Sequence, residues 1–150
     1  MSEKEILDKL KRNMGPKHVL KTSVPRTGKV FVEIDKKKLK DAIRFLKTAG
    51  FTHLSAITGL ETEDEIELLY HLSNGGVLLT IRVKLPLNKT VIPSITTHIL
   101  GATLYEQEIH ELLGVNFEGH PNLAPLILPD DWPKDNYPLR KSRRTEKEKE

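Results

Sequence analysis

Two patterns of apolar residues divide the chain as far as Val115 into short helices and strands. Stretches with apolar residues three and four positions apart predict helices, and stretches rich in β-branched residues between turn-forming residues predict strands. Helices are expected over residues 3–12, 36–48, 95–99 and 103–113. Strands are expected over residues 18–24, 29–34, 51–58, 65–72 and 77–85. This mixture of elements predicts an α+β fold.

The boundaries of several elements carry signals of their own. Ser2 stands three positions before Glu5, which is the spacing of a capping box at the start of a helix. Gly50 and Gly114 follow two of the helical patterns and are typical of helix ends. The pair Asn74-Gly75, between the last two predicted strands, is a strong signal for a tight hairpin.

The chain changes character after Val115. Five prolines within residues 121–138 exclude a helix, because each removes a backbone N–H and clashes with the preceding turn. Large apolar residues stand between these prolines, which is not the composition of a disordered linker. We therefore expect an extended strap over residues 121–142 whose apolar side chains lie on a surface. The sequence leaves open whether that surface belongs to the same domain or to another subunit.

Together these patterns predict one α+β domain over residues 1–120, followed by the proline-rich strap and by a charged tail over residues 143–150. In the domain, an antiparallel or mixed sheet is expected to carry its helices on one face. The chain of 150 residues has the length of a single domain and can bury enough surface to fold without disulfides.

Composition narrows the possible chemistry. The chain has no cysteine, which excludes disulfides and argues against iron–sulfur clusters, since these are normally held by cysteine thiolates. The net charge of +3 comes without a clustered basic face, so nucleic acid is not an expected partner. No apolar run approaches the roughly 20 residues that span a bilayer, so membrane association is expected to be indirect. The many Lys and Glu residues indicate a heat-adapted source.

The densest group of ionisable residues lies in the last predicted helix. Glu106 and His110 are four positions apart and share one helix face, whereas Glu108 and Glu111 share another. One histidine with carboxylates could bind a hard metal ion, but zinc sites normally use three or four ligands. The other interpretations are a solvated charged face and a polar interface. With no nucleotide-binding glycine motif or nucleophile motif in the sequence, we assign no catalytic, cofactor-binding or metal-binding residue.

A longer pattern surrounds this helix. Residues 106–123 read Glu-Gln-Glu-Ile-His-Glu-Leu-Leu-Gly-Val-Asn-Phe-Glu-Gly-His-Pro-Asn-Leu. Pro-Asp-Asp-Trp follows at residues 129–132, and Pro-Leu-Arg-Lys at residues 138–141. In order and spacing, this stretch resembles the signature of the 30-kilodalton subunit of respiratory complex I, a subunit shared with membrane-bound nickel–iron hydrogenases. The predicted α+β fold agrees with that family, so the resemblance covers residues 1–142.

Three departures from the family pattern favour one branch of it. Gln107 replaces an arginine, Glu111 replaces an aspartate, and Ala124-Pro125 stand where quinone-reducing members commonly carry two arginines. These changes favour a membrane-bound nickel–iron hydrogenase or a ferredoxin-linked relative. One alternative is the equivalent subunit of a NADH–quinone oxidoreductase. Another, from a different class, is a small independent hydrolase that uses the glutamates and the histidine of the helix.

The resemblance implies a structural subunit of a peripheral electron-transfer arm, on the cytoplasmic side of the cell membrane and attached to it only through the complex. Subunits of this family carry no redox centre, so neither a cofactor nor independent activity is expected in this chain. The implied partners are the large catalytic subunit and the iron–sulfur small subunit, with the strap as docking element. The candidate interface residues are Glu106, Glu108, Glu111, His120, Pro121, Trp132, Leu139, Arg140 and Lys141.

Overall fold

The two longest strands form the centre of the sheet in the computed structural model, which describes residues 2–141. β4 (Glu65–Asn74) and β5 (Val77–Pro86) pair antiparallel on either side of a Gly-Gly turn, which confirms the predicted hairpin. Alternate residues on both strands are fully buried, as the period of a strand requires. These residues are Ile66, Leu68, Tyr70, Leu72, Leu79, Ile81, Val83 and Leu85. The opposite face of the pair is only half-buried, so the sheet has one core face and one partly open face.

Three more strands complete this sheet, in the order β1-β2-β5-β4-β3. β1 (Val19–Arg26) and β3 (His53–Glu61) form its two edges. β2 (Lys29–Ile34) pairs parallel with β5, whereas the other neighbouring strands pair antiparallel. The sheet is therefore mixed.

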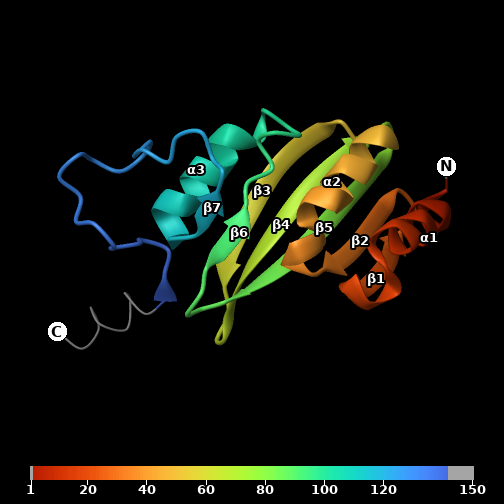
Figure 1. Ribbon diagram of the computed structural model, residues 1–150, viewed down its shortest axis with the longest axis horizontal. Helices are drawn as coiled ribbons and strands as arrows, with labels where there is room; N and C mark the ends of the chain where they lie inside the picture. The colour runs from red at the N-terminus through yellow and green to blue at the C-terminus, as the bar shows by residue number, and fades with distance from the viewer. Residues whose placement is uncertain (1, 142–150) are drawn as a thin grey trace.

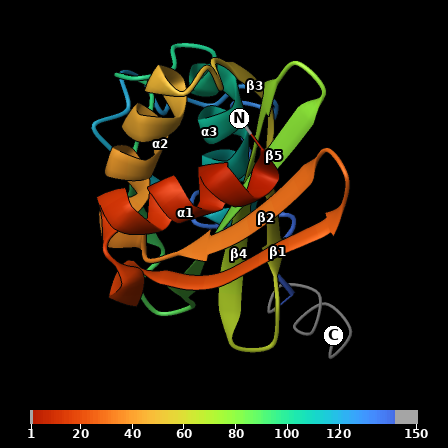
Figure 2. The same ribbon diagram turned by 90° about the vertical axis from the view of Figure 1, so that its right-hand side faces the viewer.

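Three helices cover the core face of the sheet, as Figures 1 and 2 show. They are α1 (Glu3–Met14), α2 (Leu39–Thr48) and α3 (Ala102–Leu113), and short 3-10 helices lie at Pro16–His18 and Lys36–Lys38. Each α-helix turns an apolar stripe towards the core. α3 approaches β3 closely at Gly59, where an added Cβ would lie 2.6 Å from Cδ1 of Leu113. A glycine at this position therefore sets how near α3 lies to the sheet.

A second, two-stranded sheet flanks α3. β6 (Val91–Pro93) pairs parallel with β7 (Asn116–Glu118), and neither was predicted, because three residues are too few to show an alternation. The prediction of a helix over residues 95–99 is wrong, since this stretch forms turns. Only a single turn closes there, through the N–H of Ile99 donating to the carbonyl of Ile95 at 2.9 Å, and one turn gains too few hydrogen bonds to offset the cost of helix nucleation.

Residues 119–140 form bends and turns without a helix or a strand. In Figure 1 this blue stretch loops away from the sheet and comes back beside α3. The prediction of an extended strap is therefore not supported, because hydrogen bonds return the stretch to its own domain. The predicted charged tail, residues 143–150, lies outside the described residues. Within residues 2–141, no helix is long and apolar enough to cross a membrane.

Candidate functional site

The candidate interface residues gather on α3 and on residues 119–141, which we call the C-terminal segment. Three polar residues of α3 are buried, although a helix surface pattern would leave them in solvent. They are Glu106, Gln107 and Glu111. Buried polar groups need hydrogen-bond partners. Glu106 finds them before α3, whereas Gln107 and Glu111 find them in the C-terminal segment. α3 therefore organises the backbone around it.

Glu111 holds the C-terminal segment through three consecutive backbone N–H groups. Its Oε2 accepts the N–H of Leu126 at 3.2 Å and that of Ile127 at 2.7 Å. Its Oε1 accepts the N–H of Leu128 at 2.7 Å. Hydrogen bonds to a carboxylate are short and about twice as strong as those between neutral groups. A single side chain of α3 thus fixes the turn at residues 126–128.

Two further hydrogen bonds fasten the C-terminal segment on either side of this turn. Nε2 of Gln107 donates to the carbonyl of Ala124 at 2.5 Å. The N–H of Leu139 donates to the carbonyl of Leu112 at 3.0 Å. The Gln107 bond is to a backbone carbonyl, so it depends on the course of the chain at position 124 and not on the side chain there.

Arg140 joins the end of the C-terminal segment to α3 and to β3. Its Nε donates to the carbonyl of Leu113 at 2.5 Å, at the C-terminal end of α3, where a cation is favourable. Its Nη1 lies 3.9 Å from Oε1 of Glu61, a carboxylate of β3 whose side chain is only 5% exposed. The backbone N–H of Lys141 also donates to Glu61. Arg140 therefore places a positive charge beside the buried carboxylate of Glu61 and reduces the cost of burying it.

Gly114 is required where α3 ends. Its φ of 74° lies in the left-handed region, which favours glycine. An added Cβ would lie 2.5 Å from Cε2 of Tyr137 in the C-terminal segment. The helix end was recognisable from the sequence, but the close approach of Tyr137 was not.

Glu106 points into the core, away from the C-terminal segment. It is fully buried, and its two oxygens accept the hydroxyl of Ser94 at 2.6 Å and the N–H of Ile95 at 2.9 Å. Burial raises the pKa of Glu106, although these two hydrogen bonds oppose the effect. Burial, together with the charge of Glu106, also raises the pKa of Tyr70 well above its ordinary value. Glu106 is thus a structural group of the core.

His120 attaches the start of the C-terminal segment to the first turn of α3. Its Nδ1 accepts the N–H of Asn122 at 2.9 Å, and its Nε2 lies 2.9 Å from the carbonyl of Thr103. Because a carbonyl can only accept, Nε2 carries the proton in this arrangement. Nδ1 of His110 similarly donates to the carbonyl of Val115 at 2.8 Å. Both histidines thus bind backbone groups rather than forming a ligand pair.

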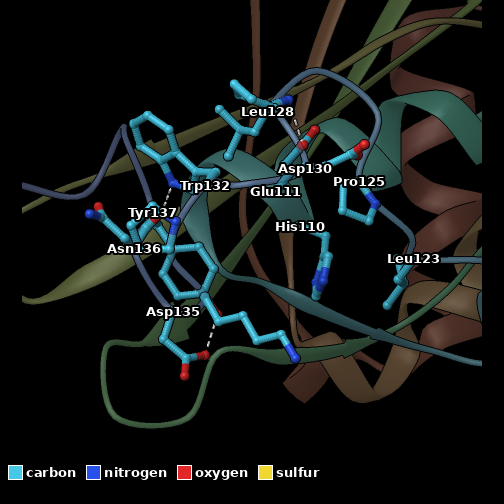
Figure 3. A pocket seen from close by; sticks show the side chains of 13 residues that line it. His110, Glu111, Leu123, Pro125, Leu128, Asp130, Trp132, Asp135, Asn136 and Tyr137 are labelled. Carbon is cyan, nitrogen blue, oxygen red and sulfur yellow. Dashed lines mark hydrogen bonds between the residues drawn. The ribbon is translucent and has the colours of Figure 1, made fainter.

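A cavity of about 420 Å³ lies between α3 and the C-terminal segment (Figure 3). His110 and Glu111 line it from α3, and Trp132 and Tyr137 line it from the segment. Nε1 of Trp132 donates to the carbonyl of Asn136 at 2.7 Å, which closes a small turn at the cavity wall. Nowhere in residues 2–141 do three His, Asp or Glu side chains gather closely enough to hold a metal ion.

Apolar side chains of the C-terminal segment remain exposed. Leu126 and Ile127 are 48% and 55% exposed, although their N–H groups are bound to Glu111. Leu139 is 45% exposed in the same segment. Apolar side chains presented together on a backbone fixed by hydrogen bonds are typical of surfaces that contact another protein. The segment can therefore offer apolar side chains to a partner without first having to fold.

The structure divides the nine candidate interface residues into two groups. Five have side chains bound inside the chain: Glu106, Glu111, His120, Trp132 and Arg140. The other four are exposed: Glu108, Pro121, Leu139 and Lys141. The sequence did not single out Leu126 and Ile127 as interface residues, because their presentation depends on the distant Glu111. The part that any of these residues plays in an interface stays a prediction.

Comparisons with known proteins agree with this geometry. Residues 32–149 match the family described as "Respiratory-chain NADH dehydrogenase, 30 Kd subunit". A relative from Methanosarcina mazei, one of the subunits of its F(420)H(2) dehydrogenase, is 33% identical over 131 residues, covering 84% of this chain and 82% of that protein. Membrane-bound hydrogenase subunit beta of Pyrococcus furiosus is 33% identical over 129 residues, covering 81% of this chain and 74% of that protein.

A solved structure extends the likeness to the three-dimensional fold. It is a chain from the membrane-bound sulfane sulfur reductase, described as an archaeal respiratory membrane complex. That chain superposes with a TM-score of 0.82 at 27% sequence identity. The match covers 97% of this chain and 89% of the other, so the shared fold is not confined to the central sheet.

Proposed function

Because the chain belongs to the 30-kilodalton subunit family of respiratory-chain NADH dehydrogenases, we propose that it is a structural subunit of the peripheral electron-transfer arm of a complex-I-related membrane complex. Relatives named as subunits of a dehydrogenase, a hydrogenase and a respiratory complex support this function. The chain is proposed to hold other subunits together, while electrons pass through cofactors in those subunits. Its lack of cysteine supports this division of labour, since iron–sulfur clusters normally need thiolate ligands.

The observation that carries the proposal is the turn at residues 126–128. Glu111 satisfies its backbone N–H groups, while Leu126 and Ile127 keep about half of their surface exposed. A backbone that is already ordered loses little conformational entropy on binding, so apolar contacts with a partner translate efficiently into affinity. We therefore propose the C-terminal segment as a docking element for the large catalytic subunit, with the iron–sulfur small subunit as a second neighbour.

Within the family, we propose the branch of membrane-bound nickel–iron hydrogenases and ferredoxin-linked relatives. The hydrogenase relative from Pyrococcus furiosus supports this branch. The equivalent subunit of a NADH–quinone oxidoreductase is the alternative. In either case the proposed location is the cytoplasmic side of the membrane, with attachment through the other subunits.

The geometry does not favour an independent hydrolase. Glu106 is fully buried and bound to Ser94 and Ile95, so a substrate in solvent cannot reach it. Glu108 lies on the exposed side of α3, and Nδ1 of His110 is bound to a backbone carbonyl. The three side chains that such an enzyme would need therefore do not converge on one site.

Two truncations test the docking role, each expressed together with the rest of the complex. Truncation after His120 removes residues 121–150, and with them nearly all of the C-terminal segment, whereas truncation after Lys141 removes only residues 142–150. We expect the large subunit to copurify with the longer product and to be lost from the shorter one. Equal recovery of the large subunit with both products would show that the C-terminal segment is not the docking element.

A pair of point substitutions separates docking from folding. Leu126→Ser combined with Ile127→Ser leaves the backbone bonds to Glu111 in place but removes the exposed apolar side chains. The matched control is Leu20→Ser with Val24→Ser on β1, where 56% and 43% of the side chains are exposed. Recovery of the large subunit should fall with the first pair and stay normal with the second. Equal recoveries would contradict docking through Leu126 and Ile127.

Metal analysis of the purified complex distinguishes the two branches. Nickel in the copurified large subunit is the result expected for the hydrogenase branch. A nickel-free large subunit that reduces quinones would overturn the proposed branch and leave the structural role intact.

A further inference from the structure

We propose that a basic hollow between α2, the start of β3 and the turn before α3 binds an oxyanion, either a carboxylate or a phosphate. This inference does not depend on the proposed function. The hollow has a volume of about 470 Å³ and lies on the opposite end of α3 from Gly114. In Figure 1, the start of β3 and the turn before α3 both lie near the upper edge of the molecule.

The ionisable groups that line the hollow are bases or weak acids, with no carboxylate among them. Lys47 contributes from the last turn of α2, His53 from the start of β3 and His98 from the turn before α3. Tyr105 lines it from α3, and its hydroxyl is held by the carbonyl of Ser55 at 2.8 Å. One lysine and two imidazoles, from three separate elements, therefore face one space.

Neighbouring residues of α2 strengthen this positive field. Arg44 is four positions after Lys40 and three positions before Lys47. This spacing puts the three side chains on the same side of α2. All three act electrostatically on His98. The carboxylate that also acts on His98 is Asp41, which already lies 3.6 Å from Arg44 and 3.9 Å from Lys38. With both histidines neutral, three cations and one carboxylate therefore act on His98, which leaves a net positive charge around it.

The shift in the pKa of His98 indicates that the electrostatic potential around it is positive. Burial lowers the pKa of His98, and the charges of Arg44, Lys40 and Lys47 lower it further. Protonation of His98 is therefore opposed by neighbours that an anion in the hollow would neutralise. By linkage, an anion that binds the protonated form more tightly must raise the pKa of His98.

The other residues that line the hollow indicate what kind of molecule the oxyanion belongs to. Leu100, which is 79% exposed, and the ring of Tyr105 give the hollow an apolar side. Thr52, an exposed residue that also lines the hollow, adds a hydroxyl that can donate a hydrogen bond. An oxyanion on an apolar body fits this combination better than a small inorganic ion. Such a ligand could be the acidic side chain of a neighbouring subunit or a free organic phosphate.

Proton NMR titration of the histidines in the full-length chain tests the proposal, with inorganic phosphate as the probe. Phosphate and chloride are compared at equal ionic strength, and His98→Gln identifies the His98 signal. We expect phosphate to raise the titration midpoint of His98 by about half a pH unit or more, with little change at His120. An equal response of His98 and His120, or no response, would overturn the proposal.

Three substitutions give a matched series. Lys47→Gln should reduce the response of His98 to phosphate, and Asp41→Asn should increase it, because the two changes have opposite effects on the local charge. Lys9→Gln, on the exposed face of α1, removes the same charge as Lys47→Gln far from the hollow and should leave the response unchanged. Equal effects of Lys9→Gln and Lys47→Gln would mean that only net charge matters, which would contradict a site.

The assembled complex distinguishes the two sources of the oxyanion. If a neighbouring subunit supplies a carboxylate, assembly should abolish the response to phosphate, and a Lys47→Glu complex should dissociate at lower salt than the wild-type complex. If the ligand is a free phosphate compound, the response should persist in the complex and Lys47→Glu should assemble normally. Both results support the site. If no oxidoreductase subunit copurifies with the chain, the proposed function is wrong. The phosphate titration would still test this inference by itself.

Discussion

At the scale of single residues, the two buried glutamates of α3 show how neighbours determine the role of a side chain. In the sequence, Glu106 and Glu111 belong to one charged stretch that suggested a metal site, a solvated face or an interface. In the structure, Glu106 fixes the turn before α3 and Glu111 fixes the C-terminal segment after it. The acidic pattern was recognisable from the sequence. The partners were not, because they stand 11 to 17 positions away and, apart from the hydroxyl of Ser94, are backbone groups.

The raised pKa of Glu106 predicts a loss of stability as pH rises. The folded chain binds the Glu106 proton more tightly than the unfolded chain, so the stabilising contribution is complete below the ordinary value of 4.5 and is lost through the higher folded pKa. Glu106→Gln imitates the protonated group. Its free energy of unfolding, relative to wild type, should therefore increase in urea titrations as the pH rises above the ordinary value of 4.5.

Glu108→Gln is the matched control for this prediction, because Glu108 is exposed on the same helix. Its difference from wild type should change little with pH. A difference for Glu106→Gln that is as constant as that of Glu108→Gln would contradict a raised pKa of Glu106.

The contacts of Glu111 predict a local effect on hydrogen exchange. Glu111→Gln removes the negative charge and one of the two accepting oxygens, and each charged hydrogen bond contributes about 1.5–3 kcal/mol. The amides of Leu126, Ile127 and Leu128 should then exchange about tenfold faster or more. Glu108→Gln should leave these amides unchanged. Unaltered exchange in Glu111→Gln would show that the turn is held by other contacts.

At the scale of secondary structure, elements were predictable where a local pattern repeats. The β4–β5 hairpin, β2 and α2 lie close to their predicted ranges because alternation, an Asn-Gly turn and a helical stripe are all local. β6 and β7 were missed because each is only three residues long and gains its partner from the other side of α3. The false helix at residues 95–99 was inferred from a pattern of only five residues, and a single turn forms there, because so short a segment cannot offset the cost of helix nucleation.

Gly114 offers a test of how α3 meets the C-terminal segment. Gly114→Ala places a side chain at a φ of 74° and within 2.5 Å of the ring of Tyr137. The left-handed conformation alone costs about 1–2 kcal/mol in free energy of unfolding, and displacement of Tyr137 adds to it. Urea unfolding measures the sum.

Gly76→Ala, in the β4–β5 turn, is the control for Gly114→Ala, because an added Cβ there meets nothing within 4 Å. It should cost much less free energy of unfolding than Gly114→Ala. Equal losses in the two variants would mean that neither the positive φ nor Tyr137 constrains position 114.

At the scale of the whole molecule, the family was recognisable from the sequence and the arrangement of its surface was not. The signature over residues 106–141 predicted the family that the comparisons show. The placement of helices on one sheet face also followed from apolar patterning. The return of the C-terminal segment to α3 could not be predicted, because it depends on contacts of Glu111, Gln107 and Arg140 with backbone groups remote in sequence.

The most direct test of a structural, non-catalytic subunit is affinity purification from membranes through a tag on this chain, followed by mass identification of what is bound. We predict recovery of a large catalytic subunit and an iron–sulfur small subunit, with oxidoreductase activity in the complex and none in the isolated chain. A chain that purifies as a monomer and by itself turns over a substrate or holds a redox group would contradict the account.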